Sequence, residues 1–64
     1  MNRDYDIFEK MPEGSFLWRG YVHGLECALA RLEELAKLSP NEHLLMHVPT
    51  QEVIQRLNSK QPEN

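Results

Sequence analysis

The sequence predicts a small α+β domain in which one long helix packs on one face of a three-stranded antiparallel sheet. The first observation is a stripe of Leu and Ala residues at helical spacing between residues 24 and 38. The second is a pair of β-prone segments, residues 5–10 and 16–22, joined by a Pro-Glu-Gly turn. A third β-prone segment, residues 43–48, makes the sheet wide enough to seat the helix. The expected chain order is ββαβ, with strand order 2-1-3.

The first two strands are predicted to form a hairpin with a three-residue loop. Pro12 presets φ for a type I turn, and Gly14 can adopt the left-handed conformation that rejoins the strands. Counting outward from this loop sets the register, which opposes Phe8 to Trp18, Tyr5 to Tyr21 and Ile7 to Arg19.

This register makes both faces of the hairpin apolar. One face carries Phe8, Phe16, Trp18 and Val22, and the other carries Tyr5, Ile7, Leu17, Arg19 and Tyr21. We expect the helix to cover the Phe8 and Trp18 face, because that face has no charge near its centre. A slip of one residue in the register would reverse this assignment.

Residues 39–48 allow two interpretations. Ser39-Pro40-Asn41-Glu42 fits a capping box with proline at the first helical position, which would begin a second helix. Alternatively, Pro40-Asn41 is a turn and residues 43–48 form the third strand. We favour the strand, because an isolated two-stranded hairpin is only marginally stable.

The end of the chain is expected to be a short helix followed by a frayed tail. Pro49 would end the third strand, Thr50 would cap a helix over residues 51–58, and Val53, Ile54 and Leu57 would form its apolar side. Residues 59–64 are polar and contain Pro62. Residues 1–64 are therefore expected to form a single small domain, with its ordered core at about 4–58.

Composition narrows the possible classes of function. Seven basic and ten acidic residues give a formal net charge of −3, and the basic residues are scattered, so we expect no nucleic-acid partner. No apolar run is long enough to span a membrane, and residues 1–6 lack the apolar core of a signal peptide. The single cysteine, Cys27, cannot form an internal disulfide, which indicates a cytoplasmic protein.

No residue pattern commits the chain to a chemistry. Four-residue spacing would place His43 and His47 side by side on a helix, but about 13 Å apart on a strand, too far to share one zinc ion easily. The three glycines are too widely spaced for a phosphate-binding loop. A chain of 64 residues also has little room for a ligand pocket. We therefore expect no catalytic residue, no metal ligand and no cofactor.

The sheet face that the helix leaves uncovered is the best candidate for function. Its residues are Tyr5, Ile7, Leu17, Arg19 and Tyr21. Tyr and Arg are favoured at interface cores, so we expect this face to bind a second copy of the chain, most simply as a dimer, or another protein. Three alternatives stay open: the C-terminal helix covers this face, the aromatic residues stack on a nucleic acid, or His23, His43 or His47 holds a metal or ligand at a subunit interface.

Five segments also carry a resemblance. They are Asp-Tyr-Asp-Ile-Phe-Glu-Lys at 4–10, Pro-Glu-Gly at 12–14, Leu-Trp-Arg-Gly at 17–20, Gly-Leu-Glu at 24–26 and Val-Pro-Thr-Gln-Glu-Val at 48–53. Through these segments most of residues 4–58 resembles a group of short stand-alone bacterial proteins of uncharacterised function. The resemblance implies a free-standing cytoplasmic protein, and it carries over no catalytic or binding residue.

Overall fold

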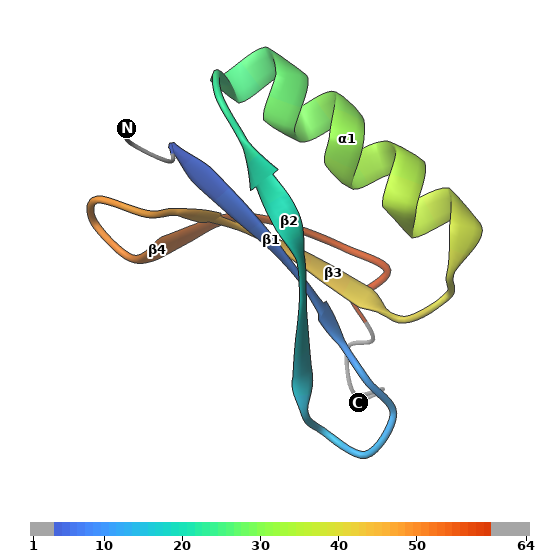
Figure 1. The fold of residues 1–64 in the computed structure, drawn as a ribbon. Coiled ribbons are helices and arrows are strands. Elements are labelled where there is room, and N and C mark those ends of the chain that lie inside the picture. The colour runs from blue at the N-terminus through green and yellow to red at the C-terminus, as the bar shows by residue number, and fades with distance from the viewer. Residues whose placement is uncertain (1–3, 60–64) are drawn as a thin grey trace, which may run out of the picture.

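The computed structural model describes residues 4–59, which form one helix and four strands. In chain order these are β1 (Tyr5–Lys10), β2 (Phe16–Val22), α1 (Leu25–Leu38), β3 (Glu42–His47) and β4 (Glu52–Leu57). All neighbouring strands are antiparallel, and their order in the sheet is β2-β1-β3-β4. The helix lies diagonally on one side of this twisted sheet (Figure 1).

The predicted hairpin and its loop are confirmed. The Gly14 amide donates to the Met11 carbonyl at 2.9 Å, and the Met11 amide donates to the Ser15 carbonyl at 2.8 Å. Gly14 has φ +105°, a conformation that residues with a Cβ rarely adopt. This turn chemistry explains why local sequence alone located both strands.

The predicted helical stripe forms the centre of the core. Ala28, Leu32 and Leu35 are buried, and they pack with Ile7 of β1 and Leu45 of β3. The half-buried residues around this cluster are Tyr5, Val22, Leu29 and Leu57. The core is small, as expected for a chain of this length.

The helix covers the opposite face of the sheet from the one predicted. Ile7, which is only 1% exposed, lies beneath α1, whereas Phe8 and Trp18 point to the other side. The predicted pairing of Phe8 with Trp18 is confirmed, but Ile7 lies opposite Gly20 rather than Arg19. Tyr5 lies opposite Val22 rather than Tyr21. The reason is an extra residue in β2, which shifts the register beyond Trp18 and was not foreseen.

Residues 51–58, predicted as a C-terminal helix, form a fourth strand instead. Thr50 lies in the turn that precedes β4 rather than capping a helix. In this turn the Gln51 amide donates to the Val48 carbonyl at 3.2 Å, with Gln51 at φ +58°. Pairing with β3 satisfies backbone groups along its outer edge, and the β-branched Val53 and Ile54 suit a strand.

The strand interpretation of residues 43–48 is confirmed, with bounds one residue earlier, and the 2-1-3 order survives as part of the four-strand order. Because β4 extends the sheet at its edge, it does not cover the second face as the alternative required. Of the predicted tail, residues 60–64 lie outside the described residues. Within residues 4–59 no helix is both long and apolar enough to cross a membrane.

Candidate functional site

One face of the sheet carries no helix among the described residues, and we call it the open face. Antiparallel pairing arranges its side chains in three rows that cross the strands. The first row is Phe16, Lys10 and Glu42; the second is Trp18, Phe8, Leu44 and Arg56; the third is Tyr21, Asp6, Met46 and Val53. Aromatic residues therefore line the β2 edge of the open face, and Arg56 and Val53 line the β4 edge.

A β-bulge in β2 brings two aromatic rings together on the open face. Ile7 lies opposite Gly20 and Phe8 opposite Trp18, so Arg19 is the extra residue. Without a bulge, residues three apart on a strand point to opposite faces. With it, the rings of Trp18 and Tyr21 stack with centroids 6.4 Å apart and planes 18° from parallel. Gly20 has φ +138°, which a glycine adopts without strain.

A second bulge lies in β4, the other edge strand. Leu45 lies opposite Gln55 and Met46 opposite Val53, so Ile54 is the extra residue. Both free edges of the sheet therefore carry a bulge, a feature that discourages edge-to-edge pairing with another chain. The open face, rather than an edge, is left as the surface suited to association.

The open face exposes three aromatic side chains along β2. The exposed fractions are 56% for Phe16, 48% for Trp18 and 55% for Tyr21. An aromatic side chain offers about 150–250 Å² of surface, so three that are half exposed contribute roughly 200–400 Å². A patch of this size is comparable with the largest apolar patch of a typical monomeric protein, which is often functional.

The charges on the open face balance. Lys10 and Arg56 are its cations and Asp6 and Glu42 its carboxylates. Arg56 Nη1 lies 3.9 Å from Glu42 Oε2, so the two charges at this end of the face are paired. A formally neutral face does not attract a polyanion by counterion release, and its apolar centre favours a protein surface as the occupant.

The five predicted interface residues do not form one surface. Ile7 and Tyr5 pack beneath α1, and Leu17 lies opposite Glu9 on the covered face. Arg19 is the bulge residue, and only Tyr21 belongs to the open face. The expectation that Ile7 is available for contact is therefore wrong. The signal that could have found the right set is Gly20, since a glycine inside a strand pattern indicates a bulge.

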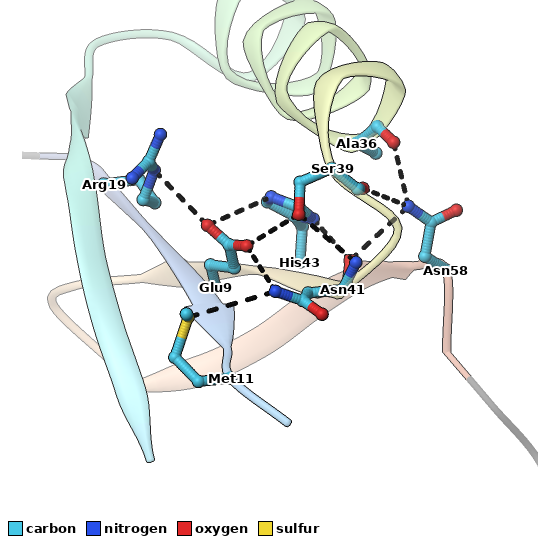
Figure 2. A network of polar contacts seen from close by, with 8 residues as sticks. All are labelled: Glu9, Met11, Arg19, Ala36, Ser39, Asn41, His43 and Asn58. Atoms are coloured by element: carbon cyan, nitrogen blue, oxygen red, sulfur yellow. Dashed lines mark hydrogen bonds and ion pairs between the residues drawn. The ribbon is translucent and has the colours of Figure 1, made fainter. Parts of the chain in front are cut away.

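A second feature is a cluster of polar side chains around two buried residues of the covered face, beyond the end of α1 (Figure 2). We call it the Glu9 cluster; its members are Glu9, Arg19, Ser39, Asn41, His43 and Asn58. Glu9 and His43 are only 5% and 1% exposed, and they lie side by side on β1 and β3. Sequence reasoning missed this cluster, because neither residue stands in a local pattern that signals burial.

Hydrogen bonds and charges surround the Glu9 carboxylate. Ser39 Oγ and Asn41 Nδ2 both donate to Glu9 Oε2 at 2.7 Å. Glu9 Oε1 lies 3.6 Å from Arg19 Nε and 3.8 Å from His43 Nε2. The hydrogen bonds from Ser39 and Asn41 lower the pKa of Glu9 from its ordinary value of 4.5, assisted by the charges of His43 and Arg19 and opposed by burial.

The same cluster supplies hydrogen-bond partners at the C-terminal end of α1. His43 Nδ1 donates to the Asn41 carbonyl at 2.7 Å, which places the ring proton on that nitrogen. Asn58 Nδ2 donates to the carbonyls of Ala36 and Ser39 at 2.9 and 3.0 Å, groups that a helix end leaves without intrahelical partners. The cluster therefore ties β1, β2, the loop after α1 and the end of β4 together.

These contacts hold the loop after α1 against the sheet. Ser39 donates its proton to Glu9 rather than to His43, so the cluster holds no serine activated by a histidine. A shallow pocket of about 350 Å³ lies beside the cluster. It is lined by Lys10, Met11, Pro12, Pro40, Asn41, Glu42 and Asn58.

The three histidines have separate partners. His43 belongs to the Glu9 cluster, His47 Nδ1 lies 2.9 Å from Thr50 Oγ1, and His23 Nδ1 lies 3.7 Å from Asp4 Oδ2. Within residues 4–59, no group of three or more His, Cys, Asp and Glu residues is placed to hold a metal ion.

Comparisons of the chain with protein-family models, with curated proteins and with solved structures found no match.

Proposed function

We propose that this protein is a non-enzymatic interaction module that forms a homodimer through the open face of its sheet. The observation that carries the proposal is the row of half-exposed aromatic residues on β2, Phe16, Trp18 and Tyr21. Tyr and Trp are enriched at the centres of protein interfaces, where each buries a large area at a small cost in side-chain entropy.

The size of the core supports the same proposal. Only six apolar residues among 4–59 are buried: Ile7, Ala28, Leu32, Leu35, Leu44 and Leu45. Chains of this length often gain stability from oligomerisation when they lack disulfides and structural metals. Burial of the open face against a second copy would add apolar contact on the side of the sheet that α1 leaves uncovered.

The single cysteine of the chain bears on where the protein acts. We propose that the protein acts in the cytoplasm, because its one cysteine, Cys27, is an exposed free thiol. Reducing compartments keep such thiols from forming disulfides between chains.

Light scattering on a gel-filtration column tests the proposal. We expect a dimer at micromolar concentration for the wild type and a monomer for Trp18→Lys, because the new ammonium group would lose its hydration in the interface. The matched control is Leu38→Lys, which places the same charge on α1 at a residue that is 82% exposed and should leave the dimer intact. A wild type that stays monomeric, or a dimer that survives Trp18→Lys, contradicts the proposal.

A nucleic-acid partner is the second candidate, favoured by one observation. Trp18 and Tyr21 present nearly parallel, half-exposed rings, which is how proteins stack on unpaired bases. The neutral charge of the open face argues against it. Retention of the protein on single-stranded DNA or RNA at about 50 mM salt, lost steeply as salt rises, would favour this candidate over the homodimer.

A further inference from the structure

The two edges of the open face carry different residues. Residues at the β2 edge are suited to contact residues at the β4 edge of a second copy. Its second row runs from Trp18 on β2 to Arg56 on β4. Its third row runs from Tyr21 on β2 to Val53 on β4. In its first row Lys10 of β1 lies beside Glu42 of β3. Each row therefore holds two residues that are suited to contact each other across an interface between two copies.

A two-fold axis in the plane of the interface can lie in two principal directions. An axis along the strands, between β1 and β3, places β2 of one copy over β4 of the other and keeps each row facing itself. An axis across the strands, along the second row, places β2 over β2 and β4 over β4. The two directions bring different residues into contact.

The axis along the strands pairs complementary groups. Trp18 faces the partner's Arg56, and an Arg guanidinium over an indole ring is a favourable cation–π contact. Lys10 faces the partner's Glu42, which is an opposite-charge pair. Arg56 has 60% of its side chain exposed, and its ion pair with Glu42 directs the guanidinium across the open face. Two-fold symmetry forms each of these contacts twice.

The axis across the strands pairs like groups along the second row, while it places Lys10 opposite the partner's Asp6, which is only 4% exposed. Arg56 would face the partner's Arg56 in an interface that excludes water, and like charges brought together in this way oppose association. Trp18 would face the partner's Trp18 without a cation. The row chemistry therefore discriminates between the two directions.

We propose that the homodimer forms by face-to-face packing about a two-fold axis along the strands, with Trp18 of each copy seated on Arg56 of the other. This inference rests on the proposed self-association and adds the identity of the contacts. Phe8, which is half-buried, lies next to the axis in the middle of the interface, beside Leu44, which is already buried within each chain. Sheets packed in this way lie about 10 Å apart with strands within about 30° of parallel, which lets their side chains interdigitate.

Thiol cross-linking tests the direction of the axis while leaving Trp18 and Arg56 in place. Three variants are made in a Cys27→Ser background: Tyr21→Cys, Val53→Cys and Phe16→Cys. With a short bis-maleimide, we expect the Tyr21→Cys and Val53→Cys proteins to cross-link to each other when mixed. The expected rate is at least about tenfold that of either protein alone, because facing thiols have a high effective concentration.

Each other outcome has a definite meaning. Cross-linking of Tyr21→Cys to Phe16→Cys in place of Val53→Cys would show the axis across the strands, so the inference fails while self-association stands. A dimer by light scattering with neither cross-link also overturns the inference alone. A wild type that is monomeric by light scattering, together with cysteine variants that do not cross-link, overturns the proposed function itself.

A double-mutant cycle supplies a second measurement that involves no cysteine. Trp18→Leu and Arg56→Gln should each weaken the dimer Kd by roughly 10- to 900-fold, because each variant homodimer loses two cation–π contacts of roughly 3- to 30-fold each. Together they should weaken it by less than the product of the two, since each removes the same contact. Arg31→Gln, an exposed arginine on α1, is the control and should leave the Kd unchanged. Strictly additive effects would contradict the contact.

Discussion

The two faces of the sheet distribute polar and apolar side chains in opposite ways. The covered face buries a carboxylate and an imidazole, Glu9 and His43, beside its apolar core. The open face displays Phe16 and Trp18, each about half exposed. Hydrophobicity alone would have put the helix on the aromatic face. The difference teaches that register and chain connection, rather than the number of apolar residues, decide which face of a small sheet is covered.

The largest expected effect lies on the covered face. Leu32→Ala removes a side chain that is fully buried at the centre of the core, and such changes cost about 2–5 kcal/mol. A domain of this length has a free energy of unfolding of roughly 3–10 kcal/mol, so the variant should be largely unfolded or close to it. Urea unfolding followed by circular dichroism measures this. Leu38→Ala, at an exposed site on the same helix, is the control and should change the free energy by less than about 0.5 kcal/mol.

The next effect concerns the bulge that separates the two faces. Gly20→Ala places a Cβ at φ +138°, where no neighbouring atom would clash, so its cost is backbone strain of about 1–3 kcal/mol. We expect a lower urea midpoint and a changed Trp18 fluorescence spectrum, because the strand relieves the strain by moving the bulge. Arg19→Ala keeps the backbone unstrained and should leave the spectrum as it is. Equal stability of Gly20→Ala and wild type would show that the bulge needs no glycine.

A smaller effect is expected on the open face. Phe16→Ser removes a side chain that is more than half exposed, so it should lower the free energy of unfolding by only about 1 kcal/mol at a concentration where the protein is monomeric. At higher concentration, where wild type is dimeric, the loss should grow because the variant also loses association. Unfolding curves at two protein concentrations make the comparison. A loss that does not depend on concentration would remove the distinction between the two faces.

The smallest expected effect is the pH-dependent loss of stability when one hydrogen bond of the Glu9 cluster is removed. Since the pKa of Glu9 is lowered in the folded protein, its ionised form contributes stability above its ordinary value of 4.5, and this contribution is lost as the pH falls through the folded pKa. Ser39→Ala removes the hydrogen bond that lowers the pKa of Glu9 most. The variant should be less stable than wild type near neutral pH, and the difference should close in acid. A difference that stays constant from neutral to acid pH would mean that Ser39 acts independently of the Glu9 charge.

The two hairpins show why part of the fold could be predicted and part could not. In both, a proline stands one residue into the turn and a residue with positive φ stands two places later: Gly14 at +105° and Gln51 at +58°. The glycine announced the first turn, whereas a glutamine at the same place gives no signal. Residues 51–58 also carry an apolar spacing that suits a short helix, and only pairing with β3 selects the strand.

The candidate site could likewise be predicted only in part from the sequence. Aromatic residues on β2 were visible in the sequence, and so was the conflict between two apolar faces and a single long helix. The shared face of Phe16 and Trp18 was predicted as well, but Tyr21 was assigned to the other face, because the Arg19 bulge reverses the side on which Tyr21 points. The Glu9 cluster was hidden for another reason: Glu9, Ser39 and His43 come together from three separate places in the chain.

Turn chemistry and helical periodicity act over a few neighbouring residues, and this is why the first hairpin and the helix could be located from residue order alone. The third strand was favoured only because a two-stranded hairpin is marginally stable by itself. Contacts between distant residues set everything else: the covered face, the fourth strand, both bulges and the buried carboxylate. These features depend on which backbone groups find partners and which side chains find room, and no short stretch of chain contains that information.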